Sequence, residues 1–198
     1  MNNYVVLGAT IALVVQLLLC REILSGKIAQ SFASWMLWAS LDALTAATVI
    51  WQSGNYLLPV AYATGSIVVA ASIWKSKNYS WTWVETTCVR LACIAIIVWM
   101  LCGARYATIV ATIAVLIAGW PQLRDAYLRP WESSILFWLG FVTANGLSTV
   151  GGKEWSVEER LYPAACTLYC VALTIVTLRK YSHATMTVAA ESEQKGDS

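Results

Sequence analysis

The fold of this chain is decided by one stretch, Ser34-Trp35-Met36-Leu37-Trp38-Ala39-Ser40-Leu41-Asp42-Ala43-Leu44-Thr45, which lies inside an apolar run over residues 32–51. A run of about twenty apolar residues is long enough to cross the hydrocarbon core of a bilayer as a helix. A charged group at that depth must face protein or water, because placing it in lipid costs about 2.5–3.5 kcal/mol or more. The stretch therefore predicts a membrane-spanning helix with a carboxylate that faces the interior of the protein.

The composition agrees with a membrane protein. Of the 198 residues, 59% are hydrophobic and 12% are charged, whereas about a quarter of the residues of a soluble domain are charged. The net charge is only +2, and the sequence has no dense run of Lys and Arg, so nucleic acid is excluded as a partner. We expect an all-α membrane protein whose main partner is the lipid bilayer.

Apolar runs of spanning length recur along the chain, and each predicts a transmembrane helix. Seven such runs cover residues 4–20, 32–51, 56–74, 84–103, 107–123, 132–151 and 161–178. Because seven is odd, the two termini are expected on opposite sides of the membrane.

The basic residues predict the orientation of the spans. One side has nine of them in the loops after the first, third and fifth runs and in the C-terminal tail: Arg21, Lys27, Lys75, Lys77, Arg124, Arg129, Arg179, Lys180 and Lys195. The other side has three, which are Arg105, Lys153 and Arg160. The positive-inside rule then places the N-terminus outside and the C-terminus in the cytoplasm. We expect a multi-pass protein of the plasma (inner) membrane.

An internal repeat is visible at an offset of 100 residues, which aligns Ser34 with Ser134 and Trp38 with Trp138. An offset of 104 aligns the third run with the seventh and Pro59 with Pro163. Matching order, spacing and loop length together indicate a duplication. Because a single helix connects the two three-helix units, both units begin on the same side of the membrane, and the repeats are parallel. The predicted organisation is 3+1+3, with units over 1–80 and 105–182, a linker helix over 81–104 and a disordered cytoplasmic tail over 183–198.

This arrangement and two short motifs resemble the PQ-loop superfamily, which includes the SWEET transporters and lysosomal amino-acid exporters. Pro121-Gln122, in Trp120-Pro121-Gln122-Leu123, matches the Pro-Gln pair at the cytoplasmic end of the first helix of a repeat. Trp38 followed four residues later by Asp42 matches a pattern common in the second helix. The resemblance implies a seven-helix bundle that moves small solutes, or a sorting receptor of the same fold.

Candidate solute-binding residues follow from helical spacing. Trp38, Asp42 and Thr45 share one helix face, at i−4 and i+3 from Asp42. Trp138 and Asn145 are at corresponding positions of the second unit, and Gln16 is a further polar residue within the first run. Two such stripes facing a central cavity would supply aromatic walls and polar groups; the alternative is that both tryptophans only pack.

Asp42 is the candidate for coupling to protons or binding a cation, because burial disfavours the charged form of a carboxylate. The alternative is a structural hydrogen bond or ion pair between helices.

Pro121 lacks the N–H that would bond the carbonyl four residues back, so the end of that run can bend. Pro121 and Gln122 are therefore hinge candidates, with a simple kink as the alternative.

A second set of residues is small and spaced by four. It comprises Ala39, Ala43 and Ala47 in one unit and Gly140, Ala144 and Ser148 in the other. Small residues at this spacing let helices approach closely in lipid, so both faces are expected to pack against other helices.

The sequence favours a secondary transporter or facilitator that moves a small neutral or cationic solute, such as an amino acid or related metabolite. A receptor or interaction protein of the same fold is the alternative, and a homo-oligomer is compatible with either. No enzyme is expected, because HExxH and GxSxG motifs and a pair of intramembrane carboxylates are missing from the sequence. Neither a cofactor nor a metal is expected.

Overall fold

The computed structural model describes residues 2–28, 30, 32–75, 83–128 and 134–196, and within these ranges it contains helices and no strand. The elements in chain order are α1 (Asn3–Leu24), α2 (Phe32–Trp51), α3 (Leu57–Lys75), α4 (Trp83–Cys102), α5 (Ala104–Ala118), α6 (Trp120–Leu128), α7 (Ile135–Gly151), the π-helix η2 (Val157–Leu161) and α8 (Tyr162–Gly196). The expectation of an all-α chain is confirmed.

Four helical stretches of the described chain are long and apolar enough to cross a membrane: Asn3–Leu24, Leu57–Lys75, Ala104–Leu128 and Val157–Arg179. Two shorter apolar helices, Val89–Cys102 and Ile135–Gly151, accompany them. Many large apolar side chains are exposed on the outside of these helices, among them Leu17, Ile67, Ile97, Met100, Leu136 and Leu168. A soluble monomer rarely leaves so much apolar surface uncovered, which indicates a membrane-embedded protein.

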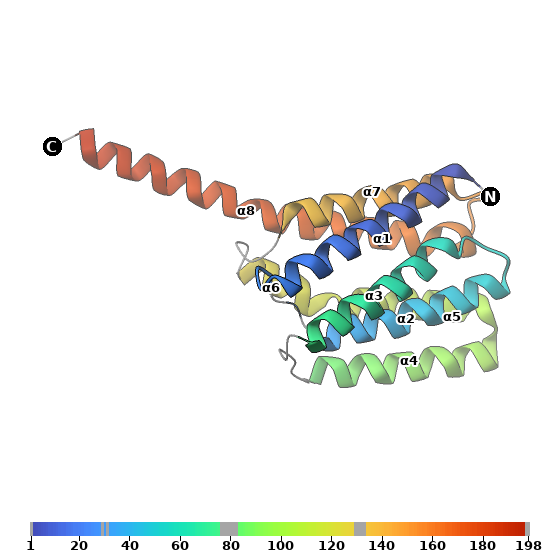
Figure 1. Cartoon of the computed structure of the whole chain (residues 1–198). Helices are drawn as coiled ribbons and strands as arrows, with labels where there is room; N and C mark the ends of the chain where they lie inside the picture. The colour runs from blue at the N-terminus through green and yellow to red at the C-terminus, as the bar shows by residue number, and fades with distance from the viewer. Residues whose placement is uncertain (1, 29, 31, 76–82, 129–133, 197–198) are drawn as a thin grey trace.

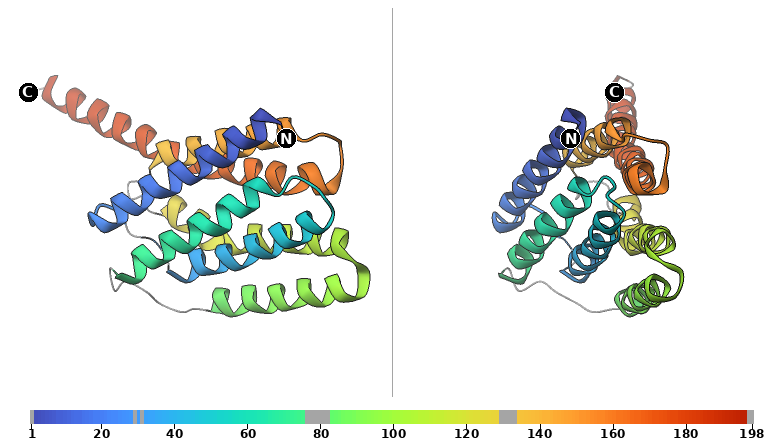
Figure 2. Two further views of the ribbon diagram at one scale, coloured as in Figure 1. Left: turned by 45° about the vertical axis from the view of Figure 1, so that its right-hand side comes forward. Right: turned by 90° about the vertical axis from the view of Figure 1, so that its right-hand side faces the viewer.

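The helices lie side by side and run back and forth between two ends of the bundle (Figure 1). α3 packs against both α1 and α2, whereas α8 packs against α5, α6 and α7. The two groups meet where α1 contacts α7 and where α2 contacts α5. α4 lies at the edge, against α5 and α2, as the end-on view shows (Figure 2).

The contact between α1 and α7 depends on small residues. A Cβ atom on Gly8 would lie 2.5 Å from the backbone oxygen of Ala144, so only glycine permits this approach. Gly140 similarly faces the Val15 side chain. The small face predicted for α7 is therefore a packing face, and its partner is α1. The corresponding face of α2 is different, because Ala43 and Ala47 are exposed and only Ala39 is buried.

Several element boundaries differ from the expected runs, and two of them concern α8. The last spanning stretch begins at Val157 rather than 161, because the π-helix η2 precedes α8 without a break. At its other end, α8 continues to Gly196, whereas a disordered tail was expected from residue 183. Residues 183–195 contain no Pro or Gly, and they include three Ala and two Glu, which are good helix formers. The end of α8 extends beyond the bundle (Figure 1).

Candidate functional site

A cavity of about 60 Å³ lies in the middle of the bundle, among α2, α3, α5, α7 and α8. Seven of its lining residues are aromatic: Trp35, Trp38, Tyr62, Trp138, Phe141, Tyr162 and Tyr169. Its polar lining residues are Asp42, Asn145 and Ser66, together with Cys166 and Cys170. Four of the predicted binding residues, Trp38, Asp42, Trp138 and Asn145, are thus brought together around one space.

Asp42 lies at this cavity and is only 3% exposed. The Tyr162 hydroxyl donates a 2.6 Å hydrogen bond to Asp42 Oδ1. Neither of the two ion pairs found in the described chain includes Asp42, so its carboxylate has no counter-charge there. Arg90, a basic residue of α4, is exposed.

The aromatic side chains contact one another around the cavity. Trp35 and Trp38 are edge to face, with their centroids 5.1 Å apart, and Trp38 Nε1 donates to the Val115 carbonyl at 3.2 Å. On the opposite side, the Tyr62 ring lies 5.8 Å from that of Phe141 and 6.4 Å from that of Tyr162. Such pairs are worth about 0.5–1.5 kcal/mol beyond area burial, so they hold the walls in defined positions.

Asn145 links α7 to α3 at the cavity. Its Nδ2 donates to the Tyr62 hydroxyl and to the Phe141 carbonyl, both at 2.7 Å. The side-chain oxygen Oδ1 is buried without a hydrogen-bond partner in the structure. An unsatisfied buried acceptor costs about 1–3 kcal/mol, so Asn145 has an unmet hydrogen-bonding need at the edge of the cavity.

Two of the predicted binding residues do not line the cavity. Gln16 is 1% exposed and lies against Gly65 of α3. In one amide orientation its Nε2 donates to the Tyr62 carbonyl and to Ser66 Oγ, each at 3.3 Å, and in the other it bonds Ala61 and Ser66. Gln16 therefore joins α1 to α3 in either case. Thr45 is fully buried, and its hydroxyl has no hydrogen-bond partner.

The hinge candidates lie just after the interruption of a helix. α5 ends at Ala118, Gly119 follows, and α6 begins at Trp120, so Pro121 is in the first turn of α6. Proline is tolerated there because its missing N–H is not needed in a first turn. The interruption is thus at Gly119, whose carbonyl accepts a 2.7 Å hydrogen bond from Tyr169 of the cavity wall. Gln122 is half-buried and does not line the cavity.

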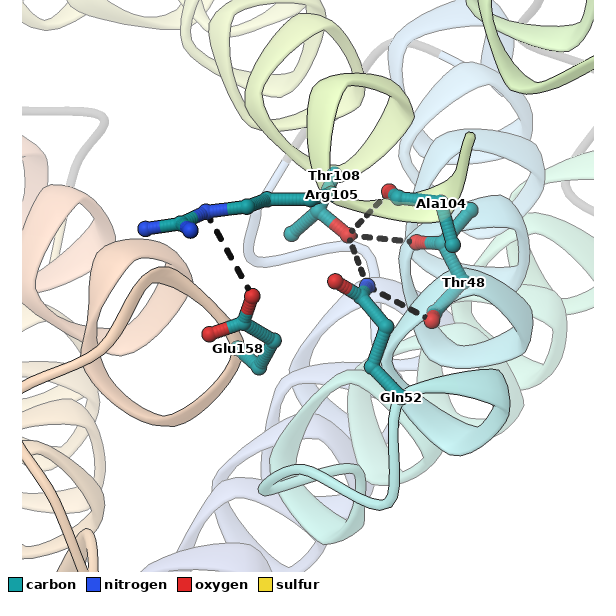
Figure 3. Close-up of polar contacts among 6 residues, drawn as sticks. All are labelled: Thr48, Gln52, Ala104, Arg105, Thr108 and Glu158. Atoms are coloured by element: carbon teal, nitrogen blue, oxygen red, sulfur yellow. Dashed lines mark hydrogen bonds and ion pairs between the residues drawn. The ribbon is translucent and has the colours of Figure 1, made fainter. Parts of the chain in front are cut away.

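Polar contacts join helices at the end of the bundle that holds the N-terminus. Gln52, at the end of α2, donates from Nε2 to the Thr108 hydroxyl of α5 at 3.0 Å, and this hydroxyl lies 2.9 Å from that of Thr48 (Figure 3). Arg105 Nε is 3.5 Å from Glu158 Oε1. Both of these side chains are partly exposed, so this ion pair contributes at most about 1 kcal/mol.

A second set of contacts at the same end involves the loop after α2. Asn55 is 8% exposed, and its Nδ2 lies 3.1 Å from Ser148 Oγ and 3.4 Å from the Glu159 carbonyl. The Asn55 backbone N–H also donates to the Glu158 carbonyl at 3.2 Å. The α2–α3 loop is therefore attached to α7 and η2.

The sequence did not single out several cavity residues, above all Tyr162. A tyrosine at the start of an apolar run is typical of the membrane interface, so its position in the sequence does not by itself indicate a buried partner. The useful signal would have been the need of buried Asp42 for a hydrogen-bond donor. Tyr62 and Ser66, four residues apart in an apolar run, are possible cavity-lining residues from the sequence alone, and both line the cavity.

No protein-family model matches the chain, and the comparisons with curated proteins and with solved structures found no match either.

Proposed function

We propose that this protein is a secondary transporter or facilitator that moves a small neutral or cationic solute across the membrane by alternating access. The central cavity is its solute site, and Asp42 is the group through which transport is coupled to protons. The protein spans the plasma (inner) membrane seven times, with its N-terminus outside, and is related to the PQ-loop and SWEET-like transporters.

The observation that carries this proposal is the cavity with Asp42 and Asn145 in its lining. Asp42 comes from the first proposed unit, on α2, and Asn145 from the second, on α7. A solute held there would contact both units at once. Motion of one unit against the other would then change which end of the site is open, as parallel-repeat transporters require.

The helix contacts support a parallel duplication. In a parallel duplication, α1 corresponds to α5 and α6, α2 corresponds to α7, and α3 corresponds to α8. The contact between α1 and α7 then corresponds to the contact between α5 and α2, and both contacts are present. The same exchange relates α3, packed against α1 and α2, to α8, packed against α5, α6 and α7. This agreement comes from contacts, so it is independent of the weak sequence identity.

Contacts at one end of the bundle limit how a solute can reach the cavity. The contacts of Gln52 and Asn55 join the proposed units at the N-terminal end. The proposed orientation puts that end outside, so these contacts would have to separate for the site to open toward the outside.

The test is uptake of labelled solutes into proteoliposomes that contain the full chain, with a panel of neutral, zwitterionic and cationic compounds. Asp42→Asn is expected to reduce uptake at least about tenfold and to remove its pH dependence. Glu22→Gln is the matched control, since Glu22 is a carboxylate at the end of α1 that pairs with Lys27. Binding without uptake of any compound would favour a receptor of the same fold, and unchanged uptake by Asp42→Asn would refute the role of Asp42.

A further inference from the structure

The charge inside the cavity limits what it can bind. Asp42 is the one charged side chain among the described residues that line it, and neither ion pair of the described chain includes it. A buried charge that lacks a counter-charge is strongly destabilising. The hydrogen bond from Tyr162 does not neutralise this charge, so the cavity favours Asp42 in its protonated form or with a cation beside it.

The walls favour an organic cation over a metal ion. The lining includes seven aromatic side chains, and the faces of such rings attract ammonium and guanidinium groups. The described residues contain no group of three or more His, Cys, Asp and Glu that could hold a metal. Rings and a single carboxylate are suited to a cation that carries N–H or C–H groups.

A zwitterion is a poor fit for the same site. The described lining has no Lys, Arg or His to pair with the carboxylate of an amino acid. That carboxylate would lie close to Asp42 in a cavity of about 60 Å³. Two carboxylates that share a small site cannot both be ionised, so an amino acid would bind only with the loss of one negative charge.

The unpartnered oxygen of Asn145 points independently to a hydrogen-bond donor. Asn145 is 0% exposed and lines the cavity, and its Oδ1 has no hydrogen-bond partner. Because this oxygen is itself buried, a small movement of the side chain would bring it to a ligand N–H, and a second N–H would bond Asp42. Ammonium and guanidinium ions have several N–H donors and no acceptor, so both fit this pair of oxygens.

The size of the cavity gives an upper limit. A cavity of about 150 Å³ binds benzene, so about 60 Å³ holds a group of only a few non-hydrogen atoms. Methylammonium and guanidinium are of this size. A sugar or a long amine would require the cavity to expand.

We propose that the cavity binds a small organic cation, an ammonium or guanidinium ion without a carboxylate. Asp42 is its counter-ion, Asn145 Oδ1 accepts one of its N–H groups, and the aromatic side chains surround it. This assignment rests on the proposed function, because it names the class of solute for that same site.

The first test is binding to the full chain in detergent, followed by thermal unfolding and by tryptophan fluorescence, since Trp35, Trp38 and Trp138 line the cavity. The probes are guanidinium, methylammonium, alanine and glucose, each at the same ionic strength adjusted with sodium chloride. Guanidinium and methylammonium are expected to give a saturable rise in melting temperature and a fluorescence change, because a ligand of the folded form stabilises it. Alanine and glucose are expected to give neither.

Variants locate the site. Asp42→Asn is expected to weaken guanidinium binding at least about tenfold, whereas Glu22→Gln binds as the wild type does. If Asp42→Asn does not fold, the wild-type chain provides the same information through Cys166 and Cys170, which line the cavity. N-ethylmaleimide is larger than the cavity, so it reaches these two buried cysteines only when the bundle opens. Guanidinium bound in the cavity should slow their labelling, measured by peptide mass spectrometry, and should leave the exposed Cys93 and Cys102 unaffected.

The outcomes separate this inference from the proposed function. Saturable binding and uptake of alanine or glucose, without a response to the cations, overturns the inference and leaves transport standing. Stabilisation by sodium ions that depends on Asp42 also overturns it. Guanidinium stays charged and does not cross a bilayer unaided, so its Asp42-dependent binding without uptake into proteoliposomes supports the inference and refutes transport. If no probe binds and none is taken up, both fail.

Discussion

The Tyr162 hydroxyl bonds Asp42 Oδ1 at 2.6 Å, although 120 residues separate the two in sequence. This hydrogen bond connects α8 to α2 across the cavity. It positions the carboxylate and supplies its one hydrogen-bond donor within the described chain. The contact is also adjacent to the π-helix η2, which ends at Leu161, and π-helical turns often occur at functional sites.

Tyr162→Phe should therefore impair the site while leaving the fold in place. Removing the hydroxyl leaves Asp42 without that donor, so we expect a loss of about 1–3 kcal/mol in unfolding free energy. Uptake of the solute should fall by roughly tenfold, with a shift in its pH profile. The measurements are thermal unfolding and proteoliposome uptake. Tyr106→Phe, at an exposed tyrosine of α5, is the control, and an equal loss in both variants would contradict the prediction.

Gly8→Ala should weaken the contact between α1 and α7. The added methyl group would lie 2.5 Å from the Ala144 backbone oxygen, and backbone cannot move aside without separating the helices. We expect destabilisation by about 1–3 kcal/mol, measured by thermal unfolding in detergent. Gly146→Ala is the matched control, because nothing lies within 4 Å of a Cβ at that position. It should be neutral or slightly stabilising, since alanine favours helix by about 1 kcal/mol.

Asn55→Ala should loosen the N-terminal end of the bundle. It removes the amide that bonds Ser148 and the Glu159 carbonyl. Cys166 should then react several times faster with a membrane-impermeant maleimide added from that side, because the end of the cavity opens more often. Lys153→Ala, at an exposed side chain of the same end, is the control. Unchanged labelling in Asn55→Ala would show that this loop does not control access.

Gly119→Ala should impair uptake more than Pro121→Ala does. A Cβ on Gly119 would lie 2.5 Å from the Tyr169 ring and hydroxyl, so it would displace a wall of the cavity and break the hydrogen bond to the Gly119 carbonyl. Pro121 is in the first turn of α6, where its replacement removes no needed contact. Uptake rates of the two variants test this, with Tyr169→Phe separating the loss of the hydrogen bond from displacement of the ring. The reverse order of effects would place the hinge at Pro121.

The sequence determined the features that depend on local periodicity. Apolar runs fixed where helices form, as α2 over residues 32–51 illustrates. Helical spacing also predicted that Trp38 and Asp42 share a face, and both line the cavity together with Trp138 and Asn145. The number of spans, the repeat and the orientation of the chain stay predictions.

Only the tertiary structure decided which residues meet between helices. The pairing of Tyr162 with Asp42, the burial of Gln16 against Gly65 rather than in the cavity, and the helix interruption at Gly119 all depend on how each helix is rotated and how closely it approaches its neighbours. Rotation and approach are set by packing among side chains far apart in sequence. Helical periodicity identifies the face of one helix, but it contains no information about the helix opposite.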